Sequence, residues 1–100
     1  MDILTKFNRE VDKLCRAHNV KTLYAFGSAV SGKLSSESDI DLIVDFEPID
    51  VLDYSDNYYK LKFSLEDIFS RHVDLLEEKS IRNPYFRKSI DQSKKLIYGC

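Results

Sequence analysis

Apolar side chains recur at helical spacing in two stretches of the chain. They appear every three or four positions over residues 2–18, and again over residues 53–70. This spacing places them along one face of a helix, which is typical of helices that pack on a sheet. We therefore predict a first helix over residues 2–18, which ends at Asn19, and a second helix over residues 53–70.

Runs of β-branched, aromatic and other apolar residues surround the second helix. The runs that predict strands cover residues 22–26, 40–46 and 73–76, with a short edge strand at 97–98. Asn83 followed by Pro84 supplies an N-cap and a first-turn proline for a last helix. Strands that alternate with helices favour an α/β fold class, and this pattern leaves both a parallel and a mixed sheet open.

The composition limits the classes of protein to which this chain can belong. The 100 residues, 43% of them hydrophobic, suffice for one compact domain with a core of its own. The formal net charge is −2, and the basic residues are scattered along the chain. Proteins that grip a nucleic-acid backbone usually carry a basic patch or stripe. We therefore expect no direct binding of nucleic acid.

The sequence gives no sign of a membrane or of an oxidising compartment. No apolar run approaches the roughly 20 residues of a membrane span, and the first residues lack the apolar segment of a signal peptide. Cys15 and Cys100 show neither metal-ligand spacing nor a disulfide framework. We expect Cys15 to lie in the core, and the protein to be cytoplasmic without a membrane partner.

Two carboxylates flank Ile40 at the start of the second predicted strand. Because side chains alternate along a strand, Asp39 and Asp41 share one face, with backbone positions about 6.6 Å apart. Neighbouring carboxylates repel each other, and a hard divalent cation removes that conflict. The pattern predicts a magnesium site. The structural alternative is that Asp39 ends the strand and Asp41 pairs with a lysine.

A Gly-Ser turn and a third acidic residue add to this picture. Gly27 and Ser28 directly follow the first predicted strand, where free backbone N–H groups favour a phosphate. An ordinary turn is the alternative for this pair. Asp74 lies inside an otherwise apolar strand, where a charge is costly unless it is paired or binds a metal.

Histidines and tyrosines receive structural interpretations. His18 falls on an apolar helix face, and His72 precedes a strand without a second His or a Cys nearby, so we expect neither to be a ligand. Tyr54, Tyr58 and Tyr59 are typical of helix packing and not of a stacking platform for bases.

The quoted residues fall into a pattern known from one family. The stretch FGSAVSGKLSSESDIDLIVDF, followed by RHVDLLE and NPYFRKSI, resembles the minimal nucleotidyltransferases (MNT) of the DNA polymerase beta-like superfamily. The resemblance covers nearly the whole chain. It implies a nucleotidyltransferase-like fold, a small mixed β-sheet packed with α-helices, in a single minimal domain over residues 1–100.

The resemblance also implies a chemistry. Asp39 and Asp41 would hold two magnesium ions (Mg²⁺), and Asp74 would be the third metal-binding carboxylate and the general base. Gly27 and Ser28 would bind the phosphates of a nucleoside triphosphate, which we expect to be ATP. The reaction would transfer AMP to a hydroxyl and release pyrophosphate.

The sequence departs from the family pattern at one position. Many relatives carry an arginine just before the second glycine of this motif, whereas this chain has Ser31 there. Lys33 is the nearest basic residue and would take part in nucleotide binding. A lysine is a point charge and does not reproduce the planar fork of a guanidinium.

By the same resemblance, the partner is a HEPN-type toxin ribonuclease. The chain would act as the antitoxin of a toxin-antitoxin pair, adenylylate a tyrosine of the toxin and form a hetero-oligomer with it. The acceptor is expected from another chain, because the metal and nucleotide half uses nearly all of the 100 residues. The departure at Ser31 motivates an alternative, a binding module that neutralises its partner by contact. A third hypothesis is a nucleotidyltransferase that acts on a small molecule.

Overall fold

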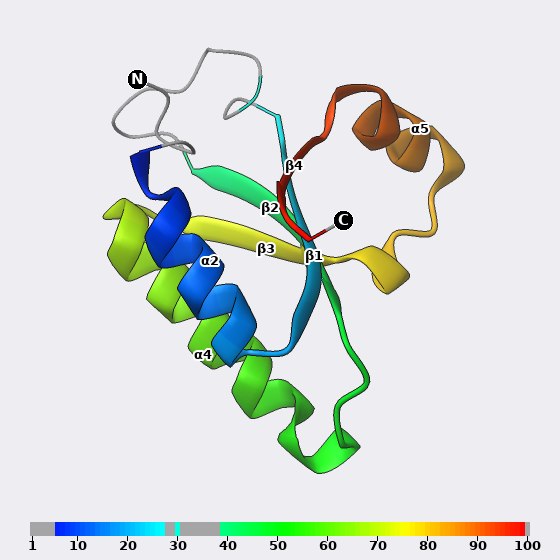
Figure 1. Cartoon of the computed structure of the whole chain (residues 1–100). Coiled ribbons are helices and arrows are strands. Elements are labelled where there is room, and N and C mark those ends of the chain that lie inside the picture. Colours follow the sequence, from blue (N-terminus) through cyan, green and yellow to red (C-terminus); the bar gives the residue numbers. More distant parts are fainter. Residues whose placement is uncertain (1–5, 28–29, 31–38, 100) are drawn as a thin grey trace.

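The structure is a computed structural model that describes residues 6–27, 30 and 39–99. A four-stranded sheet with the strand order β3-β2-β1-β4 forms its centre (Figure 1). The strands are β1 (Val20–Phe26), β2 (Ile40–Phe46), β3 (Val73–Glu77) and β4 (Lys95–Tyr98). β1 runs antiparallel to β2 and β4, whereas β2 and β3 are parallel. The sheet is therefore mixed, as the family resemblance implied.

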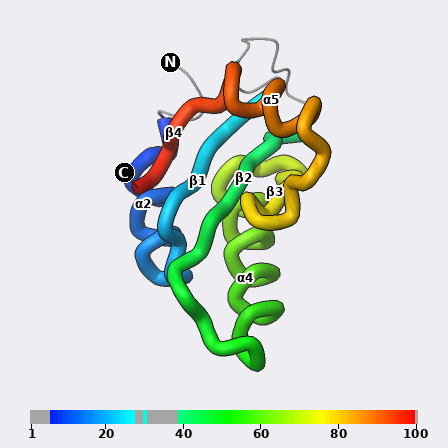
Figure 2. Tube along the Cα trace, turned by 90° about the vertical axis from the view of Figure 1, so that its right-hand side faces the viewer, coloured from blue at the N-terminus to red at the C-terminus, as the bar shows by residue number. Residues whose placement is uncertain are grey.

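Helices cover both faces of this sheet. They are α2 (Asn8–Ala17), α4 (Val51–Phe69), the short 3-10 helix η1 (Glu78–Ser80) and α5 (Pro84–Ser93). α2 and α4 lie side by side on one face, and α5 lies on the other (Figures 1 and 2). α4 crosses between the parallel strands β2 and β3, as such a connection requires.

The main core lies between the sheet and the α2–α4 layer. Alternate residues of β2 point into it, and α4 contributes Leu61, Leu65 and Phe69. Cys15 of α2 is fully buried there, which confirms its predicted place, and burial raises the pKa of its thiol to about 12. Cys100 lies outside the described residues.

The opposite face carries a smaller apolar layer under α5. Ile43 of β2 and Ile90 of α5 are both buried although neither belongs to the main core. The ring of Phe86 meets that of Phe26 edge-on, with 6.2 Å between their centroids. The Lys94 ammonium lies 4.4 Å from the centre of the Tyr24 ring. These contacts tie α5 to β1 and leave part of this face open.

Helix boundaries follow local capping chemistry. Asp50 accepts a hydrogen bond from the Leu52 N–H at 3.0 Å, so α4 begins two residues before the predicted start. Asn83 caps α5 as predicted, because its side chain accepts from two backbone N–H groups of the first turn. Asn19 has a φ of 59°, which ends the first helix where the sequence predicted. The predicted start of that helix lies outside the described residues.

The strand predictions are confirmed with small extensions. β2 has the predicted bounds, β1 begins two residues earlier than predicted, and β4 also begins two residues earlier. Among the described residues, no helix combines the length and the apolar character needed to cross a membrane.

The main core yields a matched pair of substitutions on α4. Leu65 is 0% exposed, whereas Leu52 on the same helix is 88% exposed. We expect Leu65→Ala to lower the free energy of unfolding by about 2–5 kcal/mol, because the cavity it leaves loses transfer and packing energy. Leu52→Ala should change it by less than about 0.5 kcal/mol. Urea denaturation followed by circular dichroism measures both, and equal costs would contradict the assigned core.

Candidate active site

Three strand termini meet at one end of the sheet. β1 ends where β2 begins, because these strands are antiparallel, and β3 begins beside β2, because those two are parallel. The register pairs Asp41 with Phe26 on one side and with Asp74 on the other. The structure thus brings the predicted residues Asp39, Asp41 and Asp74 to one end of the sheet, close to Gly27.

The carboxylates face away from the main core. Ile40 and Leu42 are completely buried beneath the α2–α4 layer, so Asp41 between them points to the opposite face. Asp41 is half-buried, whereas Asp39 and Asp74 are exposed. The expected cost of burying Asp74 is therefore wrong. Val73 and Leu75 of the same strand are buried on the side that faces α4, whereas Asp74 lies on the opposite, open side.

Asp41 is the electrostatic centre of the site. Burial raises its pKa above the usual range for aspartate, and the charges of Asp74 and Asp39 raise it further. Ionised Asp41 is thus held at a free-energy cost that a cation would offset. Oxygen ligands of this kind suit a hard divalent cation such as Mg²⁺. Within the part of the chain that the structure describes, no three Asp, Glu, His or Cys side chains are already grouped as a metal cluster.

Gly27 allows the backbone to lie closer to the Asp41 carboxylate than a residue with a Cβ atom would. Its φ is +69°, and a Cβ built on it would lie 2.7 Å from the Oδ2 atom of Asp41. Its carbonyl accepts a hydrogen bond from the Val30 N–H at 3.1 Å, which turns the chain directly after β1. The predicted nucleotide-binding residues Ser28 and Lys33 lie outside the described residues.

The sequence argument left His72 out of the site, and the structure places it at the edge. The Nδ1 atom of His72 lies 3.4 Å from Oδ2 of Asp39, and its Nε2 lies 3.8 Å from Oε2 of Glu66. The same Glu66 oxygen accepts the Val73 N–H at 3.0 Å, which anchors the start of β3 to α4. His72 and Asp39 each precede a strand, and only the parallel pairing of those strands reveals that they are neighbours.

The other aromatic predictions hold as structural roles. His18 Nδ1 lies 2.8 Å from the Leu14 carbonyl, and its own carbonyl accepts from the Asn57 side chain at 2.8 Å. The Tyr58 hydroxyl donates to the Leu75 carbonyl, and Tyr54 packs on the main core. These contacts hold α2 and α4 against the sheet.

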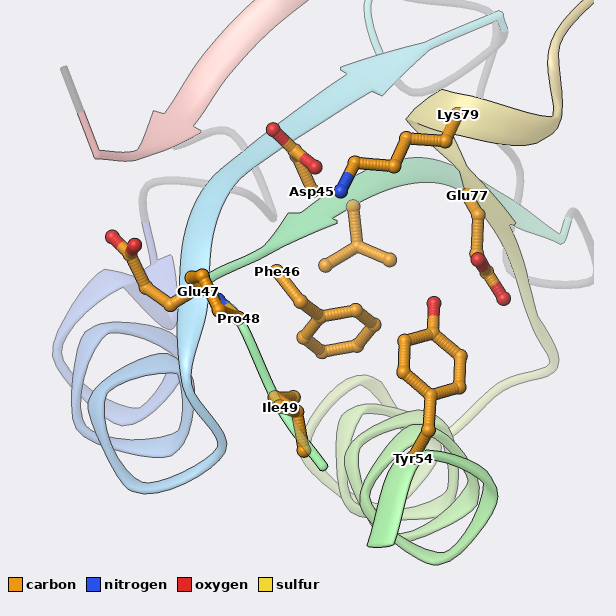
Figure 3. Close-up of a pocket in the computed structure, with 9 residues that line it drawn as sticks. Asp45, Phe46, Glu47, Pro48, Ile49, Tyr54, Glu77 and Lys79 are labelled. Atoms are coloured by element: carbon orange, nitrogen blue, oxygen red, sulfur yellow. The ribbon is translucent and has the colours of Figure 1, made fainter. Parts of the chain in front are cut away.

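A separate cavity of about 220 Å³ lies at the opposite end of β2 (Figure 3). The rings of Phe46 and Tyr54 meet there nearly at right angles, 5.5 Å apart. Figure 3 shows the Glu77 carboxylate turned toward the Tyr54 hydroxyl, and burial with a hydrogen bond to Glu77 raises the pKa of Tyr54. None of the predicted site residues lines this cavity.

Comparisons with known proteins agree with this geometry. The family model described as polymerase beta, nucleotidyltransferase matches residues 9–100. MJ1379 of Methanocaldococcus jannaschii, named as a candidate protein adenylyltransferase, is 38% identical over 97 residues, which cover 89% of this chain and 94% of that protein. Protein adenylyltransferase MntA of Thermococcus cleftensis is 30% identical over 82 residues, which cover 74% of this chain and 80% of that protein.

Solved structures share the fold. One described as a candidate minimal nucleotidyltransferase superposes with a TM-score of 0.76 and 29% identity, covering 95% of both chains. A complex of a tri-AMPylated HEPN toxin with an MNT antitoxin from Shewanella oneidensis contains a chain with a TM-score of 0.61 and 19% identity. That match covers 97% of this chain and 73% of the other. Because the family model spans nearly the whole chain and both named relatives align over most of it, this protein belongs to the polymerase beta nucleotidyltransferase family.

Proposed function

We propose that this protein is a protein adenylyltransferase that transfers AMP from ATP to a tyrosine of a HEPN-type toxin, as the antitoxin of a toxin-antitoxin pair. The observation that carries the proposal is the register that sets Asp41 beside Asp74 and next to the turn at Gly27. The names of the relatives support the choice of a protein acceptor, and the HEPN complex of the structural neighbour supports the class of partner.

Asp39, Asp41 and Asp74 are the residues that would hold Mg²⁺. When bound, the cation would supply positive charge to the phosphate oxygens of the transition state and to the leaving group. The raised pKa of Asp41 supports this assignment, because a cation relieves the repulsion that the two neighbouring carboxylates create.

The chain's own residues orient and deprotonate the acceptor. Asp74 lies on the exposed side of the site, where it takes the proton of the attacking hydroxyl as general base. The hydroxyl oxygen forms a bond to the α-phosphorus while the bond from that phosphorus to the bridging oxygen of pyrophosphate breaks. Gly27 lets the Asp41 carboxylate lie against the backbone that follows β1, because a Cβ at this position would come within 2.7 Å of Asp41 Oδ2.

A second function, neutralisation by contact alone, is favoured by one observation. Ser31 stands where many family members carry an arginine, so one guanidinium contact to the triphosphate is missing. A module that only binds its partner would not need the carboxylates. The same variants therefore separate the two functions.

Asp41→Asn tests the transfer reaction. We expect the rate of AMP transfer to a HEPN-type toxin as acceptor to fall about a thousandfold, because several kcal/mol of transition-state stabilisation is lost. Intact mass spectrometry with ATP and magnesium measures the gain of one AMP unit on the acceptor. Asp45→Asn is the matched control, since Asp45 is half-buried on the same strand but lies near its other end.

Two outcomes of this experiment would count against the proposal. One is that the unaltered protein adds no AMP to that HEPN acceptor. The other is that Asp41→Asn is as active as Asp45→Asn. If no AMP is transferred, yet the Asp39→Asn, Asp41→Asn double variant still neutralises the HEPN protein, the contact-only function replaces the enzymatic one.

The raised pKa of Asp41 predicts that Asp41→Asn increases the stability of the protein, although the same variant loses activity. The folded protein holds the Asp41 proton to higher pH than the unfolded chain does, so Asp41 lowers stability as pH rises above about 3.9, the ordinary aspartate value. In EDTA at pH 7 we expect Asp41→Asn to melt at a higher temperature than the unaltered protein. The difference should vanish near pH 3. Thermal unfolding across this range measures it, and a less stable variant at pH 7 would contradict the assigned repulsion.

Gly27→Ala tests the close approach at the turn. The left-handed backbone costs an alanine about 1–2 kcal/mol, and the added methyl would also press on the Asp41 carboxylate. We expect Gly27→Ala to lower the free energy of unfolding. We also expect the rate of AMP transfer to fall at least tenfold, because the methyl group would displace the Asp41 carboxylate from its position. In an Asp41→Ala background the clash is absent, so the stability cost should shrink to the backbone strain. An equal cost in both backgrounds would refute the contact.

A further inference from the structure

A cavity of about 320 Å³ opens on the same side of the sheet as Asp74, between β3 and the start of α5. Its apolar lining comes from Leu76, Ile81 and Phe86, and Arg82 also borders it. Figure 2 shows the segment after η1 running along β3 and back toward the end of the sheet where β2 begins. The cavity lies under this segment and is distinct from the one in Figure 3.

The lining residues connect the cavity to the candidate active site. Leu76 follows Asp74 by two positions, so both face the same side, about 6.6 Å apart along the strand. Phe86 packs edge-on against Phe26, the residue that pairs directly with Asp41. The cavity therefore begins one side chain away from the proposed general base.

The strand order decides which substrate reaches this side. Across the sheet, the turn at Gly27 follows β1, Asp41 lies on β2 and Asp74 lies on β3. In phosphoryl transfer the attacking and leaving oxygens lie on opposite sides of the phosphorus. If the pyrophosphate leaves toward Gly27, the attacking hydroxyl arrives over β3, where the cavity lies.

We propose that this cavity is the acceptor subsite and that it holds the phenol ring of a tyrosine of the partner protein. This inference rests on the proposed adenylyltransferase function and adds where the acceptor binds. Three apolar side chains suit a ring, and Phe86, 43% exposed, offers a further edge-to-face contact. The Arg82 guanidinium suits the oxygen of a phenol that is losing its proton.

The lining also selects among hydroxyl acceptors. A serine or threonine side chain is too small to fill the apolar cavity, so its hydroxyl would lack a fixed position beside Asp74. Glu77 borders the cavity as well, but its carboxylate is hydrogen-bonded to Tyr54 on the other side of β3. The cavity is thus apolar where the ring would lie.

Hydrogen bonds and ion pairs of the lining residues and their neighbours hold the walls of the cavity in place. Asn83 caps α5 by accepting from the Tyr85 and Phe86 N–H groups at 2.9 and 3.3 Å. Arg87 of α5 pairs with Glu78 of η1 and lies 3.4 Å from Asp91 on its own helix. The subsite is therefore formed before the acceptor arrives, which lowers the entropy cost of positioning it.

Phe86→Ala tests the subsite by steady-state kinetics with the HEPN protein as acceptor. We expect its KM for the acceptor to rise about tenfold, the value of one lost ring contact, while the Kd for ATP stays unchanged. Tyr85→Ala is the matched control, because Tyr85 is the adjacent aromatic residue of α5, is 84% exposed and does not line the cavity. Phe86→Leu keeps the apolar volume and should fall between the two, which guards against a failure of Phe86→Ala to fold.

A binding measurement without ATP separates this inference from the proposed function. N-acetyl-L-tyrosinamide is titrated into the full chain while NMR follows the methyl groups of Leu76 and Ile81. We expect shifts at both residues that are weaker in Phe86→Leu at the same concentration and that N-acetyl-L-alaninamide does not produce. If these shifts occur but no AMP is transferred, the ring subsite stands and the adenylyltransferase function fails.

Two results would overturn the subsite. The first is the absence of tyrosinamide-specific shifts at Leu76 and Ile81. The second is a Phe86→Ala variant that binds ATP more weakly while its acceptor KM is unchanged, because the cavity would then hold the nucleotide.

Discussion

The parallel pairing of β2 with β3 is the interaction on which the site depends. It sets Asp41 directly beside Asp74, while the antiparallel pairing of β1 brings Gly27 to the other side of the same carboxylate. Close carboxylates repel each other, so this arrangement costs folding energy unless a cation joins it. The main core offsets that cost. Ile40 and Leu42, the immediate neighbours of Asp41, are fully buried on the opposite face.

The two faces of the sheet have different roles: one is buried in the main core, and the other carries the carboxylates of the candidate site. α2 and α4 bury one face almost completely, and side chains of α4 also serve the edge strand: Glu66 accepts the Val73 N–H, and Tyr58 donates to the Leu75 carbonyl. These bonds satisfy polar groups on the free edge of β3 and so discourage pairing with another strand. α5 lies over the second face (Figure 1), and a cavity opens there between β3 and the start of α5.

Local patterns in the sequence were sufficient for most elements. The bounds of β2, the cap at Asn83 and the end of the first helix at Asn19 all follow from chemistry within a few residues. Predictions that needed long-range information were weaker. The burial cost assigned to Asp74 was wrong, because the open side of β3 depends on where α5 crosses. His72 was missed as a neighbour of Asp39, because their contact exists only through strand pairing.

The sequence by itself determined the residue types of the site, since the alternation around Ile40 puts Asp39 and Asp41 on one face in any strand. It also determined which helices have an apolar face to bury. Only the tertiary structure decided the strand order, the register and the close approach of Gly27 to Asp41. The physical reason is that side-chain periodicity is set by the backbone of a single segment. Register and neighbours, in contrast, are set by the packing of segments far apart in the chain.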